Sequence, residues 1–342
     1  MKRYLMILAS AAALLTSCTH KELCYNHREH AHRYHVEIFA DYRQDWEENY
    51  GHIDWKANWP EHYIPYDELR PEKPDGLRVI NYDDNGNSDI HNISSEGGVV
   101  SLYEGYNDIL IYNNDTEYIV FSRSDQGATT KAATKATTRT RTRSTYKGSE
   151  FATKSEETIT PPDMLYANYL EGVISERTLD PVGLDIVLQP LVYTYKVRYE
   201  FASGLEYVAM ARGALSGMAS SVLMNTGETS DISATLMYDC QLKDYGIGAL
   251  VNSFGVPSMA NQNYPTRGQA MHALNLEVVL KNGKMLTFDF DVTDQVQKQP
   301  HGGVIVVSGI TVSKEDGLEG TGGFDVSVND WGEYEDVILP LM

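Results

Sequence analysis

The chain has 342 residues, with 28 lysines and arginines against 48 aspartates and glutamates, which gives a formal net charge of −20 at pH 7. A chain this acidic is repelled by nucleic acid and by anionic lipid, so we expect no nucleic-acid partner and no membrane attachment through a basic patch. The length suits two domains of ordinary size.

The first segment in chain order, residues 1–17, has the pattern of a signal peptide. Two basic residues precede a short apolar run that ends in Leu15-Thr16-Ser17-Cys18. The run is too short to cross a membrane as a helix, which takes about 20 residues. A small residue before cysteine is typical of bacterial lipoprotein signals, which are cleaved so that the cysteine becomes acylated. We therefore predict lipidation of Cys18; an ordinary secretory signal with a chance cysteine is the alternative.

Residues 18–33 are polar, and we interpret them as a tether between the lipid and the fold. Neutral imidazole is a common ligand of zinc, copper and nickel, and four histidines gather within nine residues: His27, His30, His32 and His35. No carboxylate or cysteine completes a recognised metal-site spacing. A hydrophilic spacer that contains histidine is therefore favoured over a metal site, and we predict no cofactor.

Residues 34–123 predict a first β domain. Tyr34–Tyr42 alternates apolar and polar residues with the period of a half-buried strand. Leu77–Tyr82 predicts a second strand, and the Asn-Gly turn at residues 83–87 ends it. A loose calcium site at Asp83, Asp84 and Asp89 is the less favoured interpretation of that turn. Strands at short spacing indicate a β-sandwich, and three more are expected: Val99–Tyr103, Asp108–Asn113 and Glu117–Phe121.

Three tryptophans, Trp46, Trp55 and Trp59, fall between the first two of these strands. They could form a platform on which a sugar stacks, or they could belong to the core of the domain or to its rim. We favour the core or rim because tryptophan buries a large apolar area.

Residues 124–158 differ sharply from their surroundings because they are rich in threonine, lysine and arginine and contain few apolar residues. Such a segment cannot bury enough surface to offset the entropy lost when it becomes ordered. We predict an exposed linker or long loop. Arg139, Arg141 and Arg143 are its candidate sites for an arginine-specific protease.

Residues 159–342 predict a second β domain. Leu274–Leu280 and Leu286–Val292 alternate on either side of Asn282-Gly283, which is a strong hairpin signal. Other strands are expected over Tyr193–Phe201, Ile232–Tyr238, Val304–Val307, Ile310–Val312, Phe324–Val328 and Val337–Leu341. Only short helices are expected, over Gln44–Asn49, Met164–Leu170 and Asp294–Gln299. Unpaired thiols are favoured over a disulfide between Cys24 and Cys240.

Signatures of catalysis are missing from the sequence. Ser216 lies in Gly213-Ala214-Leu215-Ser216-Gly217, whose spacing differs from that of a Gly-x-Ser-x-Gly nucleophile. Neither a His-Glu-x-x-His motif nor a Walker or dinucleotide-binding loop occurs. We therefore expect a protein that is not an enzyme.

Two parts of the sequence resemble the fimbrillin-like surface lipoproteins of Bacteroidales. Gly97–Glu117 resembles their first domain, and Leu215–Ala219 together with Phe324–Trp331 resembles their second. The resemblance covers nearly all of the chain after the signal peptide. It implies an all-β fold of two tandem transthyretin-like (Greek-key) β-sandwich domains.

The resemblance also implies a role at the cell surface, as an anchor, tip or accessory subunit of fimbriae of the type V kind. Such a protein is held at the outer membrane by its N-terminal lipid and joins fimbrial subunits or other surface proteins by β-strand addition. Arg139, Arg141 and Arg143 lie between the domains, whereas shaft subunits of the family are cut after a first strand, which favours an anchor or a stand-alone surface protein over a shaft subunit. The alternative is a surface lipoprotein that binds a glycan or host protein through tryptophan and tyrosine patches.

Overall fold

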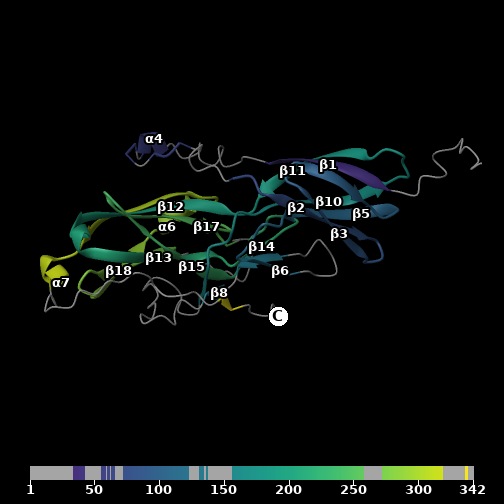
Figure 1. Ribbon diagram of the computed structural model, residues 1–342. Helices are drawn as coiled ribbons and strands as arrows, with labels where there is room; N and C mark the ends of the chain where they lie inside the picture. Colours follow the sequence, from purple (N-terminus) through teal and green to yellow (C-terminus); the bar gives the residue numbers. More distant parts are fainter. Residues whose placement is uncertain are drawn as a thin grey trace, which may run out of the picture.

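The computed structural model describes residues 34–42, 55–58, 60–61, 63–65, 72–122, 131–134, 136–137, 156–257, 272–318 and 336–337. Within these ranges the fold is all-β, as predicted, with a few short helices. The molecule is elongated and has two parts, a closed barrel and a region of two larger sheets, which lie at the right and at the left of Figure 1.

The first part is a seven-stranded barrel in the order β1-β11-β10-β5-β2-β3-β4, and it closes because β4 pairs with β1. Strand β1 runs parallel to β11 and antiparallel to β4. Alternate residues of β1, among them Val36 and Ile38, are buried in the barrel core. The strands are β1 (His35–Tyr42), β2 (Gly76–Asp83), β3 (Ser88–Ser94), β4 (Gly97–Ser101), β5 (Gly105–Asn113), β10 (Tyr166–Ser175) and β11 (Val182–Pro190).

The second part has a four-stranded sheet, β16-β17-β12-β20, packed against a seven-stranded sheet, β19-β18-β13-β15-β9-β8-β21. We call it the two-sheet region. Its core lies between the sheets, where the hydroxyls of Tyr199 and Tyr238 are 2.9 Å apart. The strands are β8 (Ala136–Thr137), β9 (Glu157–Ile159), β12 (Tyr193–Ser203), β13 (Val208–Ala219), β15 (Ser233–Asp239), β16 (Gln241–Lys243), β17 (Gly246–Ser253), β18 (Ala273–Leu280), β19 (Met285–Asp291), β20 (Gly303–Thr311) and β21 (Asp336–Val337).

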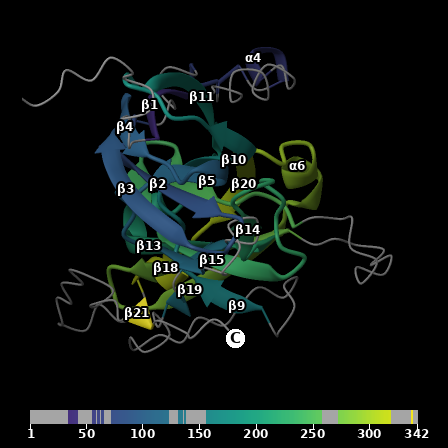
Figure 2. The ribbon, with the colours of Figure 1, turned by 90° about the vertical axis from the view of Figure 1, so that its right-hand side faces the viewer.

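A separate core joins the two parts. Ile109 and Ile111 of β5 are buried inside the barrel, whereas Leu110 and Tyr112 on its other face pack into this joint core. Strand β5 is therefore buried on both faces, which explains its continuous apolar run. The joint core also takes residues from a small sheet of β6 (Ile119–Ser122), β7 (Lys131–Thr134) and β14 (Ser221–Leu223). Figure 2 views the molecule from the barrel end, with the two-sheet region behind.

The observed sheets divide the chain differently from its composition. Strands β10 and β11 come after the predicted boundary at residue 159, yet they complete the first barrel, because Ala40 of β1 pairs with Ile186 and Leu110 pairs with Tyr169. Strands β7 and β8 fall inside the predicted linker, residues 124–158, and pair within sheets. Pairing partners far along the chain decide this assignment, and composition carries no information about them.

The helices are short, as expected. They are α4 (Trp55–Asn58), the 3-10 turn η3 (Leu205–Tyr207), α6 (Thr293–Gln297) and α7 (Lys314–Leu318). Helix α6 confirms the helix predicted near Asp294–Gln299. The helix predicted over Met164–Leu170 is wrong, because residues from Tyr166 onward form β10 and pair with β5. The helix expected over Gln44–Asn49 lies outside the described residues.

Both predicted hairpin turns are confirmed. Strands β18 and β19 pair around Asn282-Gly283, where Gly283 has a positive φ of 84° that a glycine adopts without strain. Strands β2 and β3 pair around residues 84–87. There the Asp83 carboxylate accepts four hydrogen bonds, from the backbone and side-chain nitrogens of Asn85 and Asn87. The Asp83 carboxylate, which would be a calcium ligand in the less favoured interpretation, therefore stabilises the turn.

Candidate interaction surfaces

The end of the barrel where the described chain begins forms the first candidate surface, which we call the barrel tip. The start of β1, the turn at 84–87, the link at 102–104 and the loop at 176–181 meet here. The strand register shows this, since Val36 pairs with Val182 and Ser175 with Gly105. The opposite ends of β10 and β11 continue toward the two-sheet region. The barrel tip is therefore the end of the molecule remote from that region (Figure 1).

Hydrogen bonds hold the barrel tip in place. The amide of Asn107, which is buried, donates to the carbonyl oxygens of Tyr103 and Gly105 at 2.9 and 3.0 Å and accepts from the Tyr103 N–H at 2.9 Å. Arg177 Nε donates to the Tyr34 hydroxyl at 2.9 Å and so ties the loop at 176–181 to the first described residue. Around this fixed backbone, four large apolar side chains are 52–60% exposed: Tyr106, Ile174, Leu179 and Val182.

The edge of β20 is the second candidate surface, and two glutamines close it. Gln299 Nε2 donates to the Val304 carbonyl at 2.8 Å while Gln299 Oε1 accepts from the Val304 N–H at 2.8 Å. Gln295 makes the same pair of bonds with Val306, both at 2.9 Å. The two side chains thus satisfy the outward N–H and C=O groups that a neighbouring strand would otherwise pair with. This edge is capped within the molecule.

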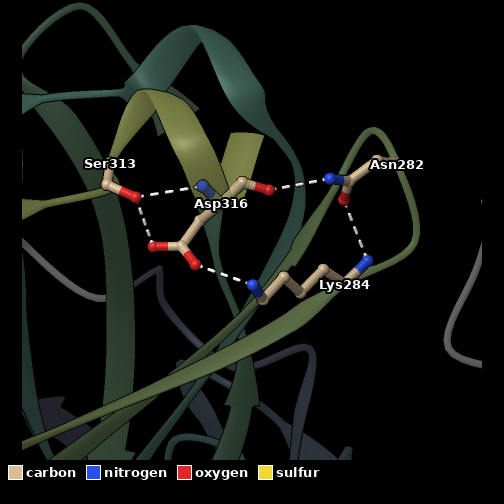
Figure 3. Close-up of polar contacts among 4 residues, drawn as sticks. All are labelled: Asn282, Lys284, Ser313 and Asp316. Carbon is tan, nitrogen blue, oxygen red and sulfur yellow. Dashed lines mark hydrogen bonds and ion pairs between the residues drawn. The ribbon is translucent and has the colours of Figure 1, made fainter. Parts of the chain in front are cut away.

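The far end of the two-sheet region is the third candidate surface, where α7 is tied to the turn between β18 and β19 (Figure 3). Lys284 Nζ donates to Asp316 Oδ1 at 2.7 Å, and Asn282 Nδ2 donates to the Asp316 carbonyl at 2.7 Å. The Ser313 hydroxyl donates to Asp316 Oδ2 at 2.6 Å and accepts from the Asp316 N–H at 3.0 Å. The Lys284 side chain, and next the Ser313 hydroxyl, hold the pKa of Asp316 below its usual value of 3.8.

Buried charge also distinguishes the two-sheet region. Arg212 of β13 lies opposite Glu277 of β18, with 2.5 Å between the guanidinium and Glu277 Oε2, and their side chains are only 2% and 1% exposed. His272, just before β18, is buried, and its burial lowers its pKa to about 4. We interpret these buried groups as structural groups.

Most of the residues singled out from the sequence lie outside the described ranges: Cys18, Cys24, His27, His30, His32, Trp46, Trp59, Arg139, Arg141 and Arg143. His35 opens β1 and Trp55 opens α4. In the described part of the chain, no three His, Cys, Asp or Glu side chains come close enough to hold a metal ion. Burial raises the pKa of the Cys240 thiol. None of the helices in the described ranges has the length and apolar character needed to cross a bilayer.

Residues 64–239, more than half of the chain, match the family described as a domain of unknown function, DUF5119. The chain belongs to this family. It is also similar to a protein of Bacteroides ovatus named "putative fimbrium anchoring subunit Fim4B". The two are 23% identical over 322 residues, which cover 84% of this chain and 90% of the other.

Two solved structures match this chain over most of its length. One is a crystal structure of a "putative adhesin" from Bacteroides ovatus, with a TM-score of 0.53 and 19% identity, covering 87% of this chain and 99% of that one. The other is the fimbrial anchor protein Mfa2 from Porphyromonas gingivalis, with a TM-score of 0.42 and 12% identity, covering 80% and 90%. The predicted resemblance to fimbrial proteins is confirmed: the chain has a relative with a fimbrial name over most of its length.

Sequence reasoning missed the glutamines that cap β20. The helix that carries Gln295 was predicted, but its contact with β20 was not. A signal was available, because Gln295 and Gln299 are four residues apart, on one face of a helix, and the apolar strand at Val304–Val307 follows at once. The barrel tip was missed because four separate connections build it.

Proposed function

We propose that this protein is a lipid-anchored, surface-exposed subunit of a fimbria, with an anchoring or accessory role at the outer membrane. The similarity to a protein named as a fimbrium anchoring subunit, over 84% of this chain, supports the fimbrial part of the proposal. The signal pattern that ends at Cys18 supports the lipid. The anchoring role is supported by the polarity of the fold, meaning that the chain enters at one end of the elongated molecule. This observation carries the proposal.

That polarity follows from where the chain enters the barrel. Tyr34 lies at the barrel tip, the end remote from the two-sheet region (Figure 1). The sixteen residues from Cys18 to residue 33 span at most about 55 Å, since an extended chain rises by at most about 3.5 Å per residue. A lipid on Cys18 would therefore keep the barrel tip nearer the membrane than the two-sheet region, which would be presented outward.

The same polarity bears on how a partner would attach. Strand addition needs an unpaired strand edge. The barrel closes on itself, and its weakest seams are β10–β11, with two residue pairs, and β3–β4, with one. The described sheets that do not close belong to the two-sheet region and to the small sheet beside it, and their edge strand β20 is capped by Gln295 and Gln299. We therefore propose that a fimbrial subunit adds its strand to the two-sheet region, at an edge other than β20 or at β20 after the glutamines are displaced.

The test is membrane fractionation of the source bacterium with two matched cysteine variants. In Cys18→Ser the acylated thiol is lost, so the protein should move from the outer-membrane fraction to the soluble fraction. Cys24→Ser, six residues later, should stay at the membrane and serves as the control. Retention of the Cys18→Ser protein in the membrane would overturn the lipid anchor.

The fimbrial role is tested separately by affinity capture from outer membranes. Wild-type protein should recover fimbrial subunits, and hydrogen exchange of the purified complex should show new protection in the two-sheet region while the barrel is unchanged. Capture of no fimbrial subunit would contradict the anchoring role. Protection confined to the barrel would contradict the proposed mode of strand addition.

A further inference from the structure

A cavity of about 290 Å³ lies where the barrel meets the two-sheet region. The first residues of β10 form one wall, the link from β11 to β12 forms a second, and the loop at 224–227 after β14 forms the third. Its volume is close to the lower limit of about 300 Å³ for small-molecule sites, which suits one compact ligand group better than an extended chain. The cavity was not part of any site predicted from the sequence.

The chemistry of the lining is neutral. Charged residues make up 22% of the chain, yet every one of the described residues that line this cavity is uncharged. The polar members are two asparagines, a glutamine, a threonine and two tyrosines: Asn168, Asn225, Gln189, Thr226, Tyr169 and Tyr193. A charged ligand would find no opposite charge here, so the lining selects for a neutral, polar ligand.

The two tyrosine rings are held in place. The Tyr169 hydroxyl donates to Asp108 Oδ2 at 3.0 Å, and the Tyr193 ring packs on the His301 ring with 4.7 Å between centroids. Held aromatic rings offer an apolar face with little entropy to lose on binding, and they suit the flat C–H face of a pyranose.

The amide and hydroxyl groups supply both kinds of hydrogen bond. Asn168 Nδ2 donates to the Val187 carbonyl at 2.7 Å, which leaves its Oδ1 as an acceptor. Thr226 Oγ1 accepts from the Glu228 N–H at 3.2 Å, which leaves its hydroxyl hydrogen as a donor. The buried Oδ1 of Asn225 has no hydrogen-bond partner among the described residues, so no bond to the oxygen opposes rotation of the amide toward a ligand.

We propose that this cavity binds one neutral sugar unit of a glycan. A sugar ring presents adjacent hydroxyls that each donate and accept, which matches the mixed donors and acceptors of Asn168, Asn225 and Thr226. Its C–H face matches Tyr169 and Tyr193, and its lack of charge matches the lining. This inference is independent of the lipid anchor and of the fimbrial role.

The test is saturation-transfer NMR on the purified full chain with neutral monosaccharides (glucose, galactose, mannose and N-acetylglucosamine) and with glucuronic acid as the charged counterpart. At least one neutral sugar should give a signal, and glucuronic acid should give none. Asn225→Ala and Thr226→Val should each lower the affinity for the sugar about three- to tenfold, which is the effect of losing one neutral hydrogen bond.

Asn92→Ala is the matched control, because Asn92 is an exposed asparagine on β3 of the barrel and outside the cavity lining; it should leave binding unchanged. Far-UV circular dichroism of each variant verifies that the fold is intact. The assignment is overturned if no neutral sugar binds, if glucuronic acid binds as well as the neutral sugars, or if folded Asn225→Ala and Thr226→Val proteins bind like the wild type.

Discussion

The barrel and the two-sheet region differ in how they protect their strand edges and in which polar groups they bury. The barrel sheet closes on itself, with two residue pairs at β10–β11 and one at β3–β4, whereas the two-sheet region keeps open edges and covers one of them with the side chains of Gln295 in α6 and Gln299 just after it. The barrel buries polar groups as neutral asparagines, Asn81, Asn107 and Asn113. The two-sheet region buries ionisable groups instead, in Arg212, Glu277 and His272.

Because of this difference, the two-sheet region should respond to pH and to a binding partner more than the barrel does. The buried amides of the barrel do not titrate, and burial raises the pKa of its Tyr42 to about 12, so the stability of the barrel should depend less on acid than that of the two-sheet region. Buried ionisable groups make stability depend on protonation, and an edge closed by side chains can open without unfolding a sheet. In the proposed orientation the robust part lies nearer the membrane and the responsive part faces outward.

Breaking the buried ion pair should have the largest effect. Arg212→Ala leaves the Glu277 carboxylate buried without its partner, which should cost about 3–5 kcal/mol of stability. Urea denaturation measures the loss, and hydrogen exchange should place it in the two-sheet region. The matched change in the barrel, Asn107→Ala, removes only a neutral amide and should cost about 1–3 kcal/mol.

A double variant, Arg212→Met with Glu277→Leu, is the control for this prediction. It removes both charges and refills much of the volume, so it should recover most of the stability that Arg212→Ala loses. If Arg212→Ala were as stable as the wild type, buried charge would not distinguish the two regions.

Acid should destabilise the two-sheet region through His272, the next largest effect. Burial lowers the pKa of His272 from 6.5 to about 4. A group whose folded pKa is lowered binds its proton more tightly in the unfolded chain. The stability is therefore fully present above pH 6.5 and is lost as the pH falls toward 4, by about 3 kcal/mol.

Urea denaturation of the wild type and of His272→Phe at pH 7 and at pH 4 measures this contribution. The difference in stability between the two pH values should be about 3 kcal/mol smaller in the variant, because the phenylalanine ring does not titrate. Equal pH dependence in both proteins would show that His272 does not couple protonation to folding.

The comparison also shows how far the sequence alone could lead. Alternating residues predicted strands such as β1 and β12, and the Asn282-Gly283 pair predicted its hairpin, because these signals are local. The strand β10 was taken for a short helix, since Met164–Leu170 lacks the alternation of a half-buried strand. Its two faces meet different environments, with Ala167 and Tyr169 in or against the joint core and Leu170 and Val173 against the barrel core.

The candidate surfaces were less accessible to prediction than the fold. The cavity at the junction combines Asn168 with Asn225, which are brought together only by the packing of one part on the other. Likewise the Arg212–Glu277 pair joins residues that are 65 apart in sequence. No spacing rule reaches across such distances, so these sites require the pairing of the strands to be known first.

Opening the capped edge should have an intermediate effect. Gln299→Leu replaces the amide by an apolar side chain of similar size and leaves the Val304 N–H and C=O without a partner, which should cost about 1–3 kcal/mol. Hydrogen exchange at the Val304 amide should become faster in Gln299→Leu, and at the Val306 amide in Gln295→Leu. Gln297→Leu, an exposed change on the same helix, is the control and should leave both amides protected. Unchanged exchange in all three variants would show that α6 does not guard this edge.

The smallest effects should come from two partly exposed carboxylates, one in each region. Hydrogen bonds lower the pKa of both carboxylates. The largest contribution comes from the Asn87 side chain for Asp83 and from the Lys284 side chain for Asp316. Their contributions are therefore present above pH 3.8 and are lost as the pH falls through the lower folded values. Asp83 serves only its own turn, whereas Asp316 joins α7 to the turn at Asn282.

Hydrogen exchange of Asp83→Ala and Asp316→Ala at pH 7 can distinguish these two roles. Asp83→Ala should speed exchange only in residues 83–88, because all four bonds to its carboxylate come from that turn. Asp316→Ala should speed exchange in two separate segments, 281–284 and 313–318, because the network of Figure 3 links them. If only 313–318 responded, α7 would be held by Ser313 alone. Asp316 would then stabilise only its own segment, as Asp83 does in the barrel.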